Sequence, residues 1–123
     1  MKNRTNGHWN RMHGSRHHII SRSINGPDVP ENKYLWIQEK HAAYHRLFYN
    51  YLPSIVIGII NLWTDQDGNL KLQLMGERNI QAWQDVFNGA TPAQAVKFIQ
   101  KNFLPVESKF LRGELGGDYE KDR

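Results

Sequence analysis

Residues 16–50 combine four of the six histidines of this chain with two short hydrophobic segments, and this stretch restricts the possible fold most. The histidines form an adjacent pair, His17 and His18, and a second pair four residues apart, His41 and His45. On a helix, residues at positions i and i+4 project from the same face. Two imidazoles on one helical turn form half of a site for a divalent ion, because neutral imidazole is the commonest metal ligand.

The residues after the first pair favour a strand. Ile19 and Ile20 follow the two histidines, and residues 16–22 are therefore expected to form a short strand. Successive residues of a strand face opposite sides. His17 and His18 would then have different roles, with one binding the metal ion and the other facing substrate or water.

The rest of the stretch predicts a loop, a second strand and a helix. Residues 24–30 contain the sequence Asn-Gly-Pro-Asp, which is strong turn chemistry. Bulky and aromatic residues predict a second strand over 33–37, and helix-forming residues predict a helix over 38–49. Asn32 lies at the end of the loop, where by itself it is most simply a turn residue.

The segment after this unit is expected to be helical, with one alternative. Pro53 favours the first turn of a helix. The β-branched residues that follow also permit a hairpin, in which residues 55–62 pair with residues 70–74. Residues 65–69 resemble the start of a calcium loop, but a plain turn fits them better because the ligand spacing is incomplete.

Two further helices are predicted in the carboxy-terminal half. The first covers residues 77–88 and ends before a glycine. The second begins after Thr91, because Pro92 and Gln94 complete the pattern of a capping box. Pro105 is expected to end this second helix.

The composition limits the class of protein. A chain of 123 residues suffices for one small domain. The absence of cysteine excludes a disulfide framework and a thiolate zinc site, and it fits a reducing compartment, so we expect a cytoplasmic protein. We expect no membrane segment and no signal peptide, because the longest apolar run covers only residues 55–60 and residues 1–18 are polar and basic.

The positive charge is concentrated at the amino terminus. The formal net charge is +4, yet residues 1–23 alone carry five basic residues and no acidic residue. A basic arm that adjoins a histidine cluster indicates a polyanionic partner, most simply nucleic acid. A solvated basic tail is the alternative interpretation.

The spacing H-H-x13-N-x8-H-x3-H, on a strand, loop, strand and helix, resembles the HNH endonucleases of the ββα-metal (His-Me finger) superfamily. The resemblance covers residues 16–49 and is closest to the histidine-ligated subgroup found in nuclease colicins. The segments Ile-x-x-Arg-Ser and Asn-Gly-Pro after the first pair also resemble the basic turn and glycine-rich loop of that motif. The four-cysteine zinc site of many relatives is absent, so carboxy-terminal helices would have to brace the fold.

The resemblance implies a role for each matching residue. His17 would bind the metal ion, and His41 and His45 would complete the metal site. His18 would be the general base that takes a proton from the attacking water. Asn32 would orient His18, through a side-chain or backbone bond that bridges the loop.

The family hydrolyses phosphodiester bonds, usually in DNA, and the residue types suit that reaction. One divalent ion with an open coordination position stabilises the charge that develops on the phosphoryl and leaving oxygens. A histidine with an unperturbed pKa near 6.5 can remove a proton from water at neutral pH. Histidine ligands suit zinc, nickel, cobalt or manganese better than magnesium, which prefers an all-oxygen site. Arg16, Arg22 and Arg46 flank the expected site and are candidates for phosphate contacts.

We therefore expect an α+β fold, in which a small ββα-metal (HNH) motif packs against additional carboxy-terminal helices. The expected divisions are a basic irregular arm at 1–15, the motif at 16–50, a helical scaffold of the same domain at 51–112 and a flexible tail at 113–123. The expected function is a metal-dependent nuclease that acts on DNA. The alternatives are a catalytically inactive nucleic-acid-binding module of the same fold and a small helical interaction protein with incidental histidines.

Overall fold

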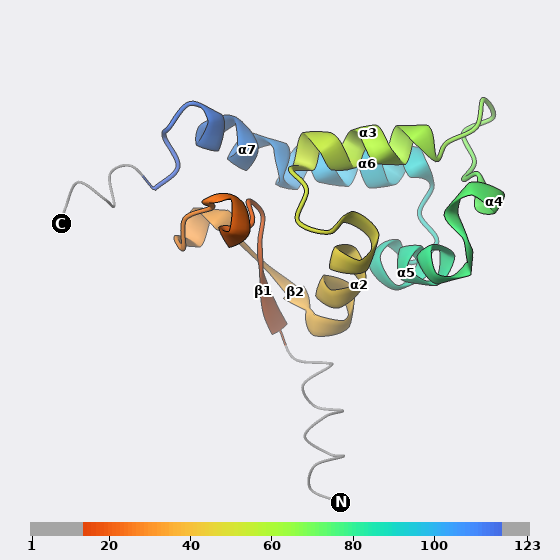
Figure 1. Cartoon of the computed structure of the whole chain (residues 1–123), viewed down its shortest axis with the longest axis horizontal. Helices are drawn as coiled ribbons and strands as arrows, with labels where there is room; N and C mark the ends of the chain where they lie inside the picture. The colour runs from red at the N-terminus through yellow and green to blue at the C-terminus, as the bar shows by residue number, and fades with distance from the viewer. Residues whose placement is uncertain (1–13, 117–123) are drawn as a thin grey trace, which may run out of the picture.

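A computed structural model describes residues 14–116 of the chain. Over this range the fold is mixed α+β, with one two-stranded antiparallel sheet and six α-helices (Figure 1). The elements are β1 (Gly14–His18), β2 (Lys33–Ile37), α2 (Gln38–Phe48), α3 (Pro53–Leu62), α4 (Leu72–Met75), α5 (Glu77–Phe87), α6 (Pro92–Asn102) and α7 (Leu104–Leu111). Two 3-10 turns, Arg22–Ile24 and Pro30–Asn32, lie in the loop between the strands. The α+β class is confirmed, and residues 1–13 of the predicted basic arm lie outside the described range.

The register of the sheet determines which strand residues face the core. His17 pairs with Tyr34, and Ser15 pairs with Trp36. These four residues share the face that meets the helices, because side chains alternate along each strand. Arg16, His18, Lys33 and Leu35 consequently lie on the opposite, outer face.

The second strand is formed as predicted, but the first strand differs from the prediction. It was expected over residues 16–22, whereas β1 ends at His18. Beyond that point the backbone N–H of Ile19 donates to the carbonyl of Asn32, and the N–H of Ile20 donates to the Asn32 side chain. These bonds replace a strand ladder, so the chain can turn away into the loop.

Helix α2 follows β2 without a connecting residue and packs back on the inner face of the sheet (Figure 1). It also packs against α5, while α3 lies beside α6. The core is formed mainly by large apolar residues from the helices and from the adjoining loop and helix cap: Ile20, Phe48, Val56, Ile60, Trp83, Ile99 and Phe103. The sheet, α2 and the later helices therefore pack around one common core.

Four predictions for the helical half are confirmed. Residues 77–87 form α5, and residues 53–62 are helical, so the alternative hairpin at 55–62 is wrong. The capping box at the start of α6 is present, since the N–H of Gln94 donates to Thr91 Oγ1 and the N–H of Thr91 donates to Gln94 Oε1. Residues 65–69 form a plain turn closed by two backbone N–H bonds to the Asp65 carboxylate.

The prediction that the helix after Thr91 ends before Pro105 is confirmed, but the further helix that follows was not predicted. Helix α6 ends at Asn102, and Pro105 lies in the first turn of a further helix, α7. Proline is favoured in a first turn, because the N–H that it lacks has no partner there in any case. The chain stays packed after this helix, since Leu115 is buried and Gly116 lies against Pro27 and Val29.

The helices of residues 14–116 are all too short or too polar to cross a membrane.

Candidate metal centre

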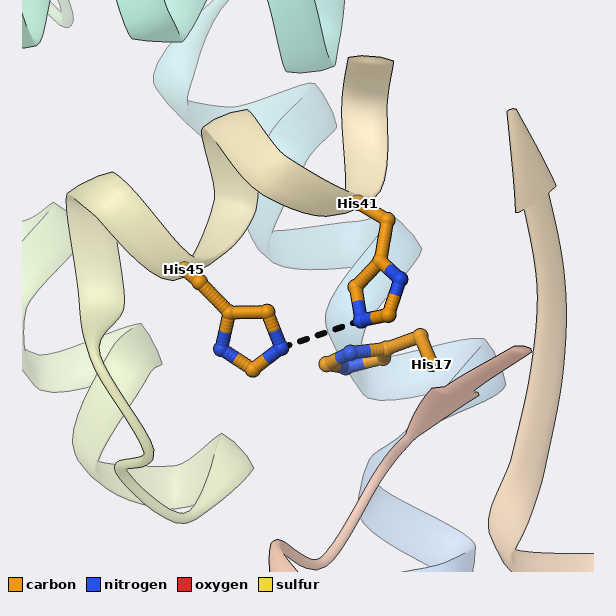
Figure 2. Close-up of side chains that lie close together, drawn as sticks. All are labelled: His17, His41 and His45. Atoms are coloured by element: carbon orange, nitrogen blue, oxygen red, sulfur yellow. Dashed lines mark hydrogen bonds between the residues drawn. The ribbon is translucent and has the colours of Figure 1, made fainter. Parts of the chain in front are cut away.

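Three histidines converge between β1 and α2. His17 comes from β1, and His41 and His45 come from successive turns of α2 (Figure 2). One ring nitrogen of each lies within 4.8 Å of one ring nitrogen of each of the others. The convergence follows from local structure, because the strand register turns His17 inward and the i, i+4 spacing aligns the other two residues.

His17 is the most enclosed member of the cluster. Its exposed fraction is only 2%, and its ring packs against those of Tyr44, Phe103 and Trp36 at centroid distances of 4.8, 5.4 and 5.6 Å. Neither of its ring nitrogens has a hydrogen-bond partner within residues 14–116. A buried polar atom without a partner costs about 1–3 kcal/mol. Such an atom is explained when a ligand supplies the missing contact.

The surroundings keep His17 neutral at physiological pH. Burial and, to a lesser extent, the nearby His45, His41 and His18 together lower the pKa of His17 to about 3. The pKa of His41 is also lowered, first by burial and then by His45 and His18. A neutral imidazole keeps a lone pair on one nitrogen, which is the form that binds a metal ion.

The hydrogen bonds of His41 and His45 orient their Nε2 atoms toward one another. The Tyr49 carbonyl lies 2.9 Å from His45 Nδ1 and can only accept, so His45 carries its proton on Nδ1 when neutral. His45 Nε2 is then an acceptor, and it lies 3.0 Å from His41 Nε2. His41 therefore donates from Nε2 and accepts at Nδ1 from the Ser15 hydroxyl, at 2.7 Å.

The spacing of the two α2 histidines suits two ligands of one metal ion after a small change. Two ligands of a tetrahedral ion at about 2.0–2.1 Å lie about 3.4 Å apart, close to the separation of the two Nε2 atoms. His41 would move its proton from Nε2 to Nδ1, and the Ser15 hydroxyl would accept there instead of donating. The carbonyl of Tyr49 already holds His45 in the ligand form.

The backbone at Tyr49 is strained where it makes this contact. Tyr49 ends α2 with φ 56° and ψ −132°, a region that residues other than glycine rarely adopt. This conformation places the Tyr49 carbonyl against His45. Residues held in such conformations cluster at active sites, ligand clamps and switch regions.

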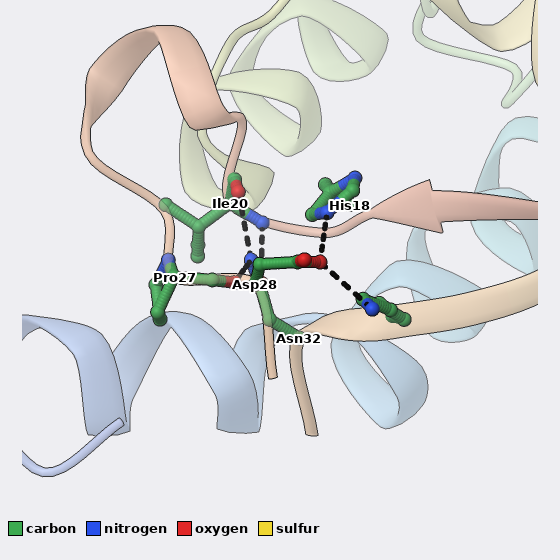
Figure 3. A network of polar contacts seen from close by, with 6 residues as sticks. His18, Ile20, Pro27, Asp28 and Asn32 are labelled. Carbon is green, nitrogen blue, oxygen red and sulfur yellow. Dashed lines mark hydrogen bonds and ion pairs between the residues drawn. The ribbon is translucent and has the colours of Figure 1, made fainter. Parts of the chain in front are cut away.

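His18 lies on the outer face of the sheet, apart from the three converging nitrogens. Its Nε2 is 3.1 Å from Asp28 Oδ1 (Figure 3). Lys33 Nζ is 2.7 Å from the same oxygen. Hydrogen bonds from Lys33 and His18 lower the pKa of Asp28 to about 2, so this carboxylate is ionised. His18 is partly exposed, with a side-chain exposed fraction of 25%.

Asn32 closes the loop that carries Asp28. Its Oδ1 accepts from the N–H of Ile20 at 2.8 Å, and its Nδ2 donates to the carbonyls of Ile20 and Pro27 at 2.9 Å each (Figure 3). The loop is so tight that a Cβ at Gly26 would lie 1.8 Å from the Ile20 carbonyl oxygen. Asn32 thus bridges the loop as expected, but its side-chain partners are backbone groups and do not include the His18 ring.

The three candidate phosphate-binding arginines are exposed, and none of them belongs to the histidine cluster. Arg16 is on the outer face of β1, Arg22 is in the loop, and Arg46 follows His45 on α2. In the described part of the chain none of the three forms an ion pair with a carboxylate. Their side chains are therefore available to an anionic partner.

Sequence reasoning missed three residues that contact the histidines, namely Ser15, Asp28 and Tyr49. The sequence predicts only a turn at Asp28, and its contact with His18 depends on the loop folding back toward β1. Ser15 lies two residues before His17 and thus on the same strand face, which is a signal that the alternation could have provided. Tyr49 contributes only its carbonyl, and no side-chain pattern reveals that.

Comparison with known proteins finds no matching family model, no matching curated protein and no matching solved structure.

The burial of His17 predicts that the metal-free protein loses stability in mild acid. The pKa of His17 is about 3 in the folded chain and about 6.5 when unfolded, so only the unfolded state takes up a proton between these values. Protonation of His17 therefore does not reduce the free energy of unfolding above pH 6.5. Below pH 6.5 the free energy of unfolding falls as the pH decreases toward 3. At pH 4.5 we expect a loss of about 2–3 kcal/mol from this residue.

Urea unfolding in EDTA between pH 7.5 and 4.5 measures this loss. A His17→Leu variant has no group to protonate at this position, so its stability should depend much less on pH. An equally steep dependence in the variant and in the wild type would contradict the assignment to His17.

Proposed function

We propose that this chain is a metal-dependent nuclease of the HNH (ββα-metal) type that hydrolyses phosphodiester bonds in DNA. The observation that carries the proposal is the convergence of His17, His41 and His45 from a strand and the following helix. The order β1, loop, β2, α2 is the arrangement that the resemblance implies. The basic amino-terminal residues and the exposed arginines support an anionic substrate.

The residues fit a divalent ion on grounds of chemistry as well as position. His17 has two buried ring nitrogens without partners, and the hydrogen bonds of His45 leave its Nε2 as an acceptor directed at the cluster. A set of three imidazoles favours zinc, nickel, cobalt or manganese over magnesium. When bound, such an ion would stabilise negative charge on the phosphoryl and leaving oxygens.

The remaining residues of the site provide the proton transfer and the positioning. His18 lies on the outer face and makes no contact with the ligand nitrogens, so it stays free to accept a proton from the attacking water. Asn32 keeps the loop closed beside it through three bonds to backbone groups. Arg16, Arg22 and Arg46 would hold phosphates of the substrate backbone.

Incubation of plasmid DNA with the full chain tests the proposal. We expect cutting in the presence of Mn²⁺, Ni²⁺, Co²⁺ or Zn²⁺ and no cutting in EDTA. A control with Mg²⁺ alone should be weaker, because magnesium prefers oxygen ligands. Intact plasmid with every metal would contradict the proposed activity.

The alternative function is a catalytically inactive module of the same fold that binds nucleic acid. It is favoured by the same arginines and would leave the plasmid intact. A gel-shift assay together with the cleavage assay separates the two functions. For an inactive module, the wild type would retard DNA on the gel but would cleave it with none of the metals.

A further inference from the structure

One carboxylate contacts the outer-face histidine, and the resemblance gives it no role. Asp28 extends from the loop toward His18 (Figure 3). His18 pairs with Lys33 across the two strands. Asp28 Oδ1 lies 3.1 Å from His18 Nε2 and 2.7 Å from Lys33 Nζ. One carboxylate oxygen thus bridges a cross-strand pair.

This contact determines which nitrogen of His18 carries the proton. An ionised carboxylate has no proton and can only accept a hydrogen bond. His18 must therefore donate from Nε2, and the neutral ring then keeps its lone pair on Nδ1. Lys33 binds the same oxygen and holds the carboxylate in place, so the orientation of the ring does not depend on His18 alone.

Asn32, the residue expected to orient His18, has its side chain fully engaged elsewhere. Its side-chain oxygen accepts a hydrogen bond from the N–H of Ile20, and its side-chain nitrogen donates hydrogen bonds to the carbonyls of Ile20 and Pro27. Pro27 directly precedes Asp28, so the bond from Asn32 fixes the backbone that carries the carboxylate. Asn32 therefore positions the loop, and the contact with the imidazole is made by Asp28.

We infer that Asp28 is the positioning residue for His18, holding Nε2–H and leaving Nδ1 as the nitrogen that accepts the proton of water. The inference rests on the proposed nuclease function. In the reaction, water gives one proton to Nδ1 as its oxygen bonds to phosphorus, and the bond from phosphorus to the leaving oxygen breaks. The leaving oxygen takes a proton from solvent. The imidazolium that forms is stabilised by the adjacent Asp28 carboxylate.

Nitrogen-15 NMR of the metal-free full chain at neutral pH tests the contact without any use of activity. In the wild type, long-range proton–nitrogen spectra should show His18 protonated at Nε2 and not at Nδ1, with a resolved Nε2–H proton protected from exchange. Asp28→Ala should lose that resolved proton, and Asp28→Glu, with a carboxylate one methylene further out, should recover it in part. Glu31→Gln, which removes an exposed carboxylate from the same loop, is the matched control and should leave the His18 signals unchanged. A protonated Nδ1 in the wild type, or identical spectra for Asp28→Ala, would overturn the inference.

Kinetics with the metal ion test the catalytic consequence. Asp28→Ala should lower kcat about 10–100-fold, with KM for DNA and the affinity for the metal ion changed by less than about twofold. In a His18→Ala background the same substitution should cause no further loss, because Asp28 acts through His18. A further loss in that background would overturn the positioning role. A wild type that binds metal but cuts no DNA would refute the proposed function, and the spectra still decide the contact separately.

Discussion

Replacement of His18 by alanine is expected to lower the rate of DNA cleavage by about 100- to 10,000-fold, the contribution that a positioned general base makes. The affinity for the metal ion should stay within about twofold of the wild type, because the nearest polar partner of His18 is Asp28 and not a member of the cluster. Single-turnover cleavage of plasmid measures the first quantity, and calorimetric titration with Mn²⁺ or Zn²⁺ measures the second.

Glu31→Gln is a suitable control for the His18 experiment, since it removes an exposed side chain of the same loop that pairs only with Lys109 in the described structure. It should cut DNA at the wild-type rate. Full metal-dependent activity in the His18→Ala variant would remove His18 from the proposed mechanism.

Replacement of His45 by alanine is expected to lower metal affinity and cleavage together. Mutation of a residue that only orients a ligand typically costs about 10–100-fold in metal affinity, and loss of the ligand itself should cost at least as much. His41→Ala should behave in the same way, because its Nε2 lies 3.0 Å from that of His45.

Thermal unfolding provides a readout of this second prediction that needs no substrate. A ligand at 100 times its Kd stabilises the folded state by about 2.7 kcal/mol, so a metal ion should raise the Tm of the wild type. The same concentration should raise the Tm of the His18→Ala variant equally and that of His45→Ala much less. An unchanged metal effect in His45→Ala would mean that the ion binds elsewhere, and the cluster would then be a packing feature.

The convergence of the cluster could be predicted because two simple periodicities determine it. The i, i+4 spacing of His41 and His45 and the alternation of His17 and His18 along a strand are local properties of the chain. Both are present in the structure, with His17 facing inward and His18 facing outward. The order of strand, loop, strand and helix followed from the same local signals.

Features that depend on distant contacts could not be predicted in this way. β1 ends early because the side chain of Asn32, twelve residues from Ile20, binds the backbone that would otherwise continue the strand. The contact between Asp28 and His18 requires the loop to fold back over ten residues. Pro105 permits two structures, a helix end or a helix start, and only the packing of α7 decides between them.

The unequal exposure of the three imidazoles has a consequence for how an ion would arrive and leave. His41 and His45 are half-buried, whereas His17 lies beneath the aromatic rings of Trp36, Tyr44 and Phe103. An incoming cation would bind His41 and His45 first and would lose further water molecules when it binds His17. The ion would leave by the same route, through the more exposed side formed by His41 and His45, and the aromatic rings around His17 would not have to open.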